Sequence, residues 1–284
     1  MSRLTILGLP VDALFFEEVV KNCDRLIHVP GLKWAVTLNP EIAVVAQKDK
    51  ELRRMVHEAS LVTADGSGLL WAASYLSEIR SQSVFIRWIK AFISGFHFFF
   101  SRSYRHKVIP GRVTGVDLVR VLLKLASHRG YRVFLLGGKP GVAELLRKKL
   151  FEVDPRIKIV GATDGFRLNI DDNRLSVREE DKDREHQVLS EIQRAKPHLL
   201  LVAFGPPKQE RWIFQHQKEL RAVKLAIGVG GTFDFLAGKS RRAPRWMRSV
   251  GLEFLWRLFC EPKRFRRMIT TLPKFIKLIV NSRN

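Results

Sequence analysis

Four polar side chains lie at or just beyond the ends of short apolar runs. Thr37 and Asn39 stand at the end of the run 33–38, Asp65 follows the run 60–64, and Gln209 follows the run 199–204. In an open parallel sheet, ligands bind outside the carboxyl ends of the strands. A carboxylate there can act as a general base that removes the proton of an acceptor hydroxyl. Asp65 is therefore a candidate base, and the other three are candidates for orienting the reacting groups.

These residue types also have structural explanations. Asp65 precedes Gly66, and an aspartate in such a place is common as a helix N-cap. Gln209 is also typical of the polar start of a helix. Thr114 and Asp117 have the spacing of a capping box, which would satisfy the first N–H groups of a helix. These alternatives remain open on the sequence alone.

Glycine-rich loops after the apolar runs suggest a second kind of chemistry, the binding of phosphate. Helix N-terminal N–H groups favour anions. The turn 137–141 fits neither a dinucleotide fingerprint nor a P-loop, so a tight turn is its alternative. Gly138, Lys208, Gln209 and Gly231 are predicted to share one pocket, and such an inventory suits a sugar nucleotide. The predicted substrate-binding residues of the loops are Gly137, Gly138, Lys139, Gly205, Lys208, Gly230, Gly231 and Asp234.

The sequence predicts no metal ligands. Aspartates at D-x-D spacing occur only in the charged stretch 171–186, and no histidine or cysteine cluster has ligand spacing. We expect a reaction without a metal or other cofactor, in which cationic side chains offset phosphate charge. The candidates are Arg241, Arg242 and Arg245, from a C-terminal segment that folds over the sheet edge.

Apolar runs alternate with amphipathic stretches over residues 1–240. This alternation predicts an α/β domain with a mainly parallel, Rossmann-like sheet and helices on both faces. The stretch 171–186 is expected to be a solvated loop that leads into a helix. The predicted strands are 3–9, 33–38, 60–64, 131–136, 157–161, 199–204 and 225–229. The predicted helices are 12–22, 41–58, 68–76, 114–125, 142–150, 185–195 and one that opens at Lys208.

Residues 84–107 interrupt this pattern with a basic amphipathic insertion. The segment holds eight aromatic residues, five Lys or Arg and no acid. Its apolar residues follow helical spacing from Phe85 to Phe99, while Arg87, Lys90 and Ser94 share the other side. Such a helix is typical of a membrane interface. Packing against the core or against another subunit of a homo-oligomer is the alternative.

The composition shifts again after Gly238. Residues 239–284 contain thirteen Lys or Arg and two acids, interspersed with Trp, Phe, Leu and Ile. Short basic amphipathic helices, broken near Pro262 and Pro273, are expected. Lysine and arginine near an anionic bilayer attract it without a spanning segment. We therefore predict that residues 241–284 form an appendage that docks on the membrane on the side of Asp65.

The net charge of +22 on 284 residues implies a negatively charged partner. Nucleic acid is the alternative of another class, but the sequence lacks a helix-turn-helix, zinc-finger or RNA-recognition signature. No run reaches the ~20 apolar residues of a membrane-spanning helix. The two cysteines do not suggest a disulfide framework. We expect a cytoplasmic protein attached peripherally to the inner face of the membrane, without a nucleic-acid partner.

Five motifs resemble those of the WecG/TagA/CpsF glycosyltransferase family. They are TLNPE at 37–41, ADG at 64–66, RVTGVD at 112–117, GPPKQE at 205–210 and GVGGTFDFLAG at 228–238. The resemblance covers most of residues 1–240 apart from the insertion. It implies an inverting transfer of a sugar, N-acetylmannosamine or a related hexose, from a UDP-sugar to a polyprenyl-diphosphate-linked saccharide. It also implies the base role of Asp65. Transfer of glucose or galactose in exopolysaccharide or capsule assembly is the alternative within the same class.

Overall fold

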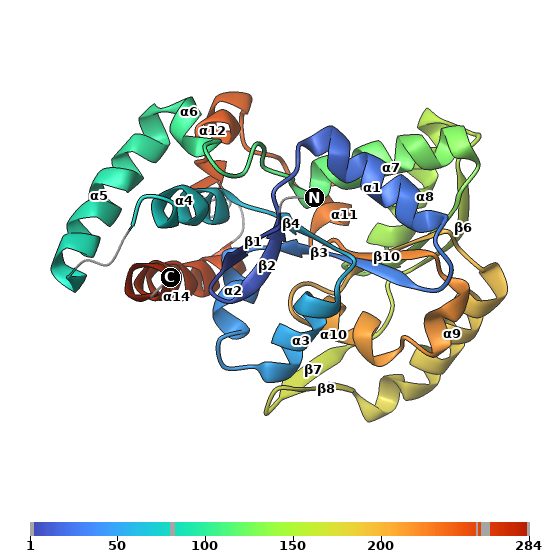
Figure 1. Cartoon of the computed structure of the whole chain (residues 1–284). Helices are drawn as coiled ribbons and strands as arrows, with labels where there is room; N and C mark the ends of the chain where they lie inside the picture. Colours follow the sequence, from blue (N-terminus) through green and yellow to red (C-terminus); the bar gives the residue numbers. More distant parts are fainter. Residues whose placement is uncertain (1–2, 80–82, 254, 257–261, 283–284) are drawn as a thin grey trace.

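A six-stranded parallel sheet forms the centre of the molecule (Figure 1). The computed structural model describes residues 3–79, 83–253, 255–256 and 262–282. The strand order is β4-β3-β10-β9-β5-β6, and every pair in it is parallel, as the alternating pattern predicted. The strands are β3 (Lys33–Leu38), β4 (Leu61–Ala64), β5 (Arg132–Gly137), β6 (Lys158–Thr163), β9 (Leu199–Ala203) and β10 (Leu225–Gly228).

Helices cover both faces of the sheet, because successive side chains of each strand point to opposite sides. Leu199 and Leu201 join one apolar cluster, whereas Leu200 and Val202 join another. The first cluster is closed by α1 (Phe16–Ile27), α7 (Gly115–Arg129), α8 (Val142–Val153) and α11 (Thr232–Leu236). The second is closed by α9 (Lys182–Ala195) and α10 (Lys208–Gln215).

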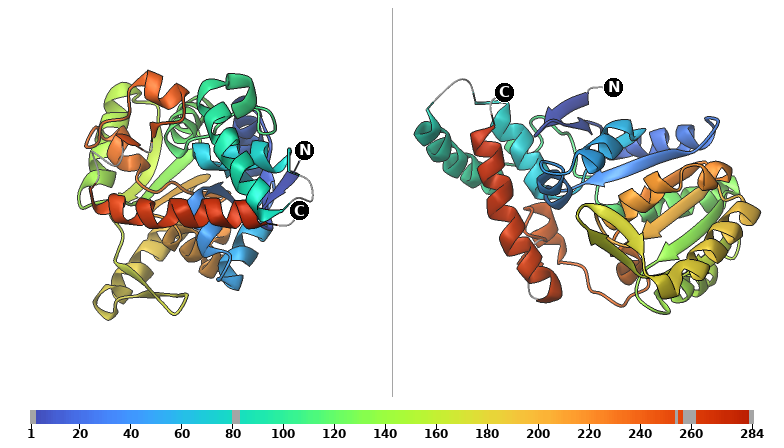
Figure 2. Two further views of the ribbon diagram at one scale, coloured as in Figure 1. Left: turned by 90° about the vertical axis from the view of Figure 1, so that its left-hand side faces the viewer. Right: turned by 90° about the horizontal axis from the view of Figure 1, so that it is seen from below.

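A third apolar cluster lies at the β4 end of the sheet, where the remaining helices gather (Figures 1 and 2). Phe275, Ile279 and Val280 of the last helix are fully buried in it, together with Leu38 and Ile42. The C-terminal helix therefore helps to form the core. The helices of this region are α2 (Pro40–Val45), α3 (Lys50–Glu58), α4 (Ser67–Leu76), α5 (Val84–Phe100), α6 (Arg102–Arg105), α12 (Arg245–Ser249) and α14 (Pro262–Asn281).

The N-terminal predictions were wrong in two places. The expected single strand 3–9 is an antiparallel hairpin of β1 (Arg3–Ile6) and β2 (Leu9–Asp12), because Leu7 and Gly8 adopt φ of 53° and 72° and reverse the chain. The expected helix 41–58 is two helices, α2 and α3. Asp49 separates them as the N-cap of α3, where its Oδ1 accepts a hydrogen bond of 2.9 Å from the N–H of Leu52.

Two further predictions were corrected in the second half of the chain. The stretch 171–186, expected as a solvated loop, includes the turn and second strand of a hairpin of β7 (Leu168–Asp171) and β8 (Arg174–Val177), with Asp172 and Asn173 at positive φ. The 3₁₀ turn η1 (Glu179–Asp181) precedes α9, and η2 (Glu219–Ala222), which follows α10, packs against α9. Helix α14 also continues through Pro273, where a break was expected. A proline removes one backbone hydrogen bond, but burial of the apolar residues that follow it favours the continuous helix.

A buried arginine ties three of these elements together. Arg211 of α10 is fully buried, forms an ion pair with Asp49 and lies 3.1 Å from Glu51. It also donates a hydrogen bond to the carbonyl of Asn173 between β7 and β8. Burial lowers the pKa of this guanidinium. Breaking a buried ion pair by removing one partner leaves an uncompensated charge, which costs far more than breaking an exposed pair.

We therefore predict that Arg211→Met lowers the free energy of unfolding by about 3–5 kcal/mol, because Asp49 stays buried without its partner. Urea denaturation measures the change. Arg54→Met is the control, since Arg54 pairs with Glu58 on the surface of α3 and its loss should matter little. Adding Asp49→Asn to Arg211→Met should restore part of the stability. An equally small loss for Arg211→Met and Arg54→Met would contradict this account.

Candidate functional site

A cavity of about 800 Å³ opens at the carboxyl edge of the sheet, where β3, β4, β9 and β10 end. Predicted residues from four separate parts of the chain meet in its wall, as expected if their strands belong to one parallel sheet. They are Thr37, Asn39, Asp65, Gln209, Gly230 and Gly231. The sequence motifs thus converge on one chamber.

Asp65 lies directly after β4 and is half-buried in the cavity wall. Its N–H donates a 2.7 Å hydrogen bond to the carbonyl of Leu38 at the end of β3, which fixes the backbone at this point. The N-cap of α4 is Gly66, with φ of 99°, so Asp65 is not the capping residue that the alternative suggested. The carboxylate is placed where it can meet a ligand.

Thr37 and Asn39 are held in place by the strands and helix around them. The hydroxyl of Thr37 donates a 3.2 Å hydrogen bond to the carbonyl of Gly228 in β10. Oδ1 of Asn39 accepts a 2.9 Å hydrogen bond from the N–H of Ile42 and so caps α2. The amide N–H groups of Asn39 are the part of this side chain that can be offered to a ligand.

Gln209 joins the two loops that follow β9 and β10. Its Oε1 accepts hydrogen bonds from the N–H of Gly205 at 3.1 Å and of Gly230 at 2.9 Å. Its Nε2 donates to Glu210 at 2.8 Å, and the side chain is 1% exposed. The two loops therefore lie on one edge of the sheet, and Gln209 shapes the cavity by holding them together.

The glutamate beside this contact was not singled out from the sequence. Glu210 is buried, and burial raises the pKa of its carboxyl group to about 7. A raised pKa of this kind is typical of functional sites as well as of buried networks.

Several predicted substrate-binding residues lie outside the cavity wall. Gly137 and Gly138 form the turn after β5, and the N–H of Gly138 donates to the carbonyl of Ala203 at 3.1 Å. Lys208 donates to the carbonyl of Leu168. Of the four residues predicted to share a pocket, only Gln209 and Gly231 line this one.

The other loop residues contact one another. Lys139 lies 3.3 Å from Asp234 in an ion pair, while the N–H of Gly205 is used by Gln209. The N–H of Gly141, at the start of α8, donates a 2.7 Å hydrogen bond to Asp164. This N–H already has a partner within the protein, which agrees with the alternative that residues 137–141 form a tight turn.

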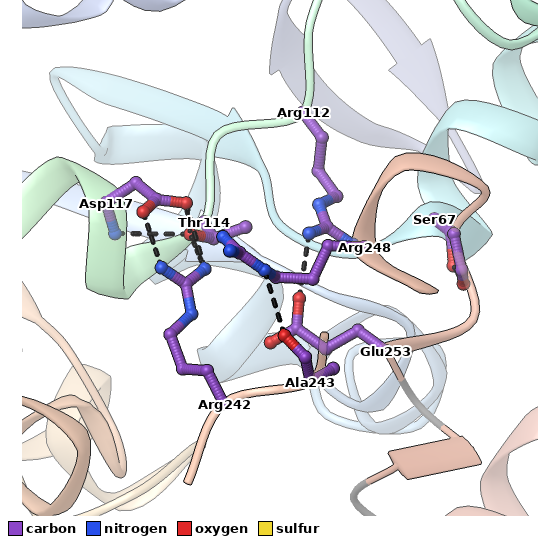
Figure 3. Close-up of polar contacts among 9 residues, drawn as sticks. Ser67, Arg112, Thr114, Asp117, Arg242, Ala243, Arg248 and Glu253 are labelled. Carbon is purple, nitrogen blue, oxygen red and sulfur yellow. Dashed lines mark hydrogen bonds and ion pairs between the residues drawn. The ribbon is translucent and has the colours of Figure 1, made fainter. Parts of the chain in front are cut away.

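An ion pair holds the start of the C-terminal segment against α7 (Figure 3). Arg242 donates to both carboxylate oxygens of Asp117, at 2.6 and 2.9 Å. Thr114 caps α7 and also donates to Asp117 at 2.7 Å. Burial opposes ionisation of Asp117, but the bonds from Arg242 and Thr114 outweigh it and lower its pKa to about 2. Arg242 thus anchors the segment.

Two further contacts fasten the same segment. Arg112 pairs with Glu253 at 2.8 Å, and the hydroxyl of Ser67 donates to the carbonyl of Gly251 at 2.9 Å (Figure 3). Of the other predicted arginines, Arg241 is exposed, and Arg245 begins α12 with a side chain outside the described part of the structure.

Some residues of the cavity wall were not predicted as site residues. Glu41, Ser67, Arg112 and Glu253 all line it. Arg112 and Glu41 lie inside the motifs RVTGVD and TLNPE, which could have identified them as site residues. No motif contains Glu253, which meets Arg112 only in the folded structure. Within the described ranges, no group of three His, Cys, Asp or Glu residues could hold a metal ion.

Two curated relatives share long stretches of this sequence. A Bacillus subtilis (strain 168) protein is 31% identical over 239 residues, which cover 84% of this chain and 75% of that protein. A Staphylococcus aureus (strain MRSA252) protein is 25% identical over 284 residues, 99% of this chain and 94% of that protein. Both are named N-acetylglucosaminyldiphosphoundecaprenol N-acetyl-beta-D-mannosaminyltransferase.

A family model covers nearly the whole chain. The model described as "Glycosyl transferase WecG/TagA/CpsF family" matches residues 4–97 and 98–284. The match includes the motifs that meet in the cavity and also helix α5 and the C-terminal helices. The chain therefore belongs to the WecG/TagA/CpsF family of glycosyltransferases.

Proposed function

We propose that this glycosyltransferase moves a hexose, N-acetylmannosamine or a close relative, from a UDP-sugar to a polyprenyl-diphosphate-linked saccharide. One observation carries the proposal. The cavity that contains Asp65, Thr37 and Asn39 at the sheet edge continues between two helices, α5 and α14, that line it with apolar side chains. Such a chamber has room for a polar saccharide at one end and a lipid at the other. The names of both relatives include a diphosphoundecaprenol acceptor.

The proposed reaction is a single displacement with inversion. The acceptor hydroxyl oxygen forms a bond to C1 of the donor sugar, and the bond from C1 to the phosphate oxygen of UDP breaks. Asp65 takes the hydroxyl proton, and UDP leaves with the bonding electron pair. Asn39 offers its amide N–H groups to the acceptor or the sugar, and Thr37 helps to form the wall beside it. A positioned base typically contributes about 10²–10⁴-fold in rate.

The leaving diphosphate needs positive charge, for which we propose side chains in place of a metal ion. Arg112 lies in the cavity wall, held at 2.8 Å from Glu253. Arg241 is exposed on the segment that folds over the site. Arg245 belongs to the same segment. We propose that Arg241 and Arg245 lie beside the diphosphate of the bound nucleotide. Preorganised cations of this kind stabilise charge that develops in the transition state.

We also propose that the protein docks on the cytoplasmic face of the membrane, where its lipid-linked acceptor lies. No helix in the described ranges is long and apolar enough to cross a bilayer. Helix α5 instead exposes a row of large apolar side chains, with Phe85 75% and Phe100 76% exposed. Lys274 and Lys277 are exposed on the neighbouring α14. Aromatic side chains beside lysines suit an anionic interface.

The first test is transfer itself. A panel of UDP-sugars is incubated with a polyprenyl-diphosphate-linked N-acetylglucosamine acceptor, and the product is identified by mass. We expect the acceptor to gain one N-acetylhexosamine unit, with UDP-N-acetylmannosamine the preferred donor, and EDTA to leave the rate unchanged. Transfer of glucose or galactose alone would replace the proposed donor. Loss of the rate in EDTA, restored by a divalent cation, would contradict the role given to the arginines.

The role of Asp65 is tested separately. We expect Asp65→Asn to lower kcat by about 10²–10⁴-fold, because the acceptor proton loses its base, while UDP-sugar affinity and thermal stability stay near wild type. Stopped-assay kinetics and calorimetric titration with UDP measure the two effects. Glu41→Gln changes the neighbouring carboxylate of the wall. If that variant alone abolished transfer and Asp65→Asn stayed active, the base would be Glu41.

Membrane docking is tested by co-sedimentation with vesicles rich in anionic phospholipid. Phe85→Ser combined with Phe100→Ser should weaken binding, because both side chains are exposed on α5 outside the cavity wall. Lys274→Glu with Lys277→Glu should weaken it by at least about fivefold per charge at low salt. Phe151→Ser is the control, since Phe151 is 59% exposed on α8, away from α5 (Figure 1). Vesicle binding unaffected by these α5 and α14 changes, or tighter binding to an oligonucleotide, would overturn the docking model.

A further inference from the structure

Helix α5 is packed with its polar side inward and its apolar side outward. Arg87 and Ser94 are 8% and 3% exposed, whereas Phe92 is 82% exposed. Arg87 donates to the carbonyl of Ser282 at 2.7 Å and of Val280 at 3.4 Å, at the end of α14. The hydroxyl of Ser94 lies 2.8 Å from the hydroxyl of Tyr104. These contacts fix the rotation of the helix, so that Phe98 is buried in the core whereas Phe92 and Phe96 face outward.

The outward side of α5 has two parts with different neighbours. One part lines the cavity through Trp88, Phe92, Gly95 and Phe96. The other, which includes Phe85, Ile93 and Phe100, is exposed but does not belong to the wall. Phe92 and Phe96 are themselves 82% and 60% exposed, so these residues of the cavity wall also face the outside.

Helix α14 supplies the facing wall. Leu272 and Ile276 line the same cavity, while Phe275 between them connects the wall to the core. We call the part of the cavity between the two helices the apolar arm, defined by Trp88, Phe92, Gly95, Phe96, Leu272 and Ile276. It belongs to the same cavity as Asp65, and Phe92 and Phe96 in its wall are also exposed. Figure 2 shows α5 and α14 beside each other. A contiguous group of exposed apolar side chains often marks a binding site.

We propose that the apolar arm binds the first isoprene units of the acceptor's polyprenyl chain. The inference rests on the proposed function, which requires a diphosphate-linked lipid in the chamber. The shape and chemistry of the arm indicate which ligand it binds. The arm is apolar on both sides, begins at the polar chamber that would hold the saccharide, and opens beside the aromatic side chains of α5. A ligand with a polar head and a single long hydrocarbon chain, as in a polyprenyl diphosphate, fits that sequence of surroundings.

Gly95 provides a way to close the arm without disturbing the fold. It lies within α5 at an ordinary helical φ, and a Cβ added there would meet no atom within 4 Å. Gly95→Phe therefore projects a ring into the arm. Ile93→Phe is the matched control, because Ile93 is 47% exposed on the outer part of α5 and adds similar bulk outside the cavity wall.

The experiment compares two acceptors that carry the same saccharide and diphosphate, one with a polyprenyl chain and one with a short alkyl chain. For Gly95→Phe we expect KM for the polyprenyl acceptor to rise about tenfold or more, since each displaced methylene is worth about fourfold in affinity. The kcat/KM for the short acceptor should stay near wild type. Ile93→Phe should match wild type with both. An equal loss for both acceptors, or no loss for either, would overturn the proposal.

A binding measurement separates this inference from the proposed transfer. Farnesyl diphosphate and inorganic diphosphate are titrated into each variant by calorimetry. We expect farnesyl diphosphate to bind wild type more tightly than inorganic diphosphate. Gly95→Phe should remove this difference and leave the affinity for inorganic diphosphate unchanged. If the difference is present but no UDP-sugar is transferred, the proposed function falls and the lipid site stands. If wild type shows no preference for the farnesyl chain, the apolar arm is not a lipid site.

Discussion

One amide oxygen holds the edge of the sheet on which the site depends. Oε1 of Gln209 accepts the N–H groups of both Gly205 and Gly230, so the loops after β9 and β10 are fixed to one another. Gly228 makes this possible, since a Cβ there would lie 2.5 Å from Nε2 of Gln209. Without the glutamine, two part-buried N–H groups would lose their partner, which is costly. The bond to Gly230 fixes the loop that brings Gly230 and Gly231 into the same cavity wall as Asp65.

The meeting of Thr37, Asp65, Gln209 and Gly231 could be predicted from the sequence, because apolar runs locate strand ends and parallel strands end at one edge. The directions of long side chains could not. Lys208 and Lys139 stand among the predicted residues but reach the carbonyl of Leu168 and the carboxylate of Asp234. Glu253 lies in the cavity wall because it pairs with Arg112, which is distant in sequence. Such contacts depend on tertiary packing, which short patterns do not record.

The parts of the fold that could not be predicted from the sequence were missed for similar reasons. The parallel sheet and the helix α5 were predicted, yet the turn at Leu7 was missed because it uses a residue that rarely adopts positive φ. Helical spacing identified two sides of α5 but not which one faces the protein. That orientation is set by Arg87, whose acceptors at Val280 and Ser282 come from the far end of the chain. An arginine inside an amphipathic pattern was therefore a sign of packing rather than of solvent exposure.

The partnership of Arg87 with the end of α14 also has a consequence for biogenesis. Synthesis proceeds from the amino end, so the ribosome completes α5 and most of the sheet long before α14 appears. Until then Arg87 lacks its carbonyl acceptors, and the cavity lacks the wall formed by Leu272 and Ile276. Contacts so distant in sequence form late in folding. A nascent chain thus has Asp65 in place before it has an enclosed chamber, and it gains the complete site only when its last helix docks.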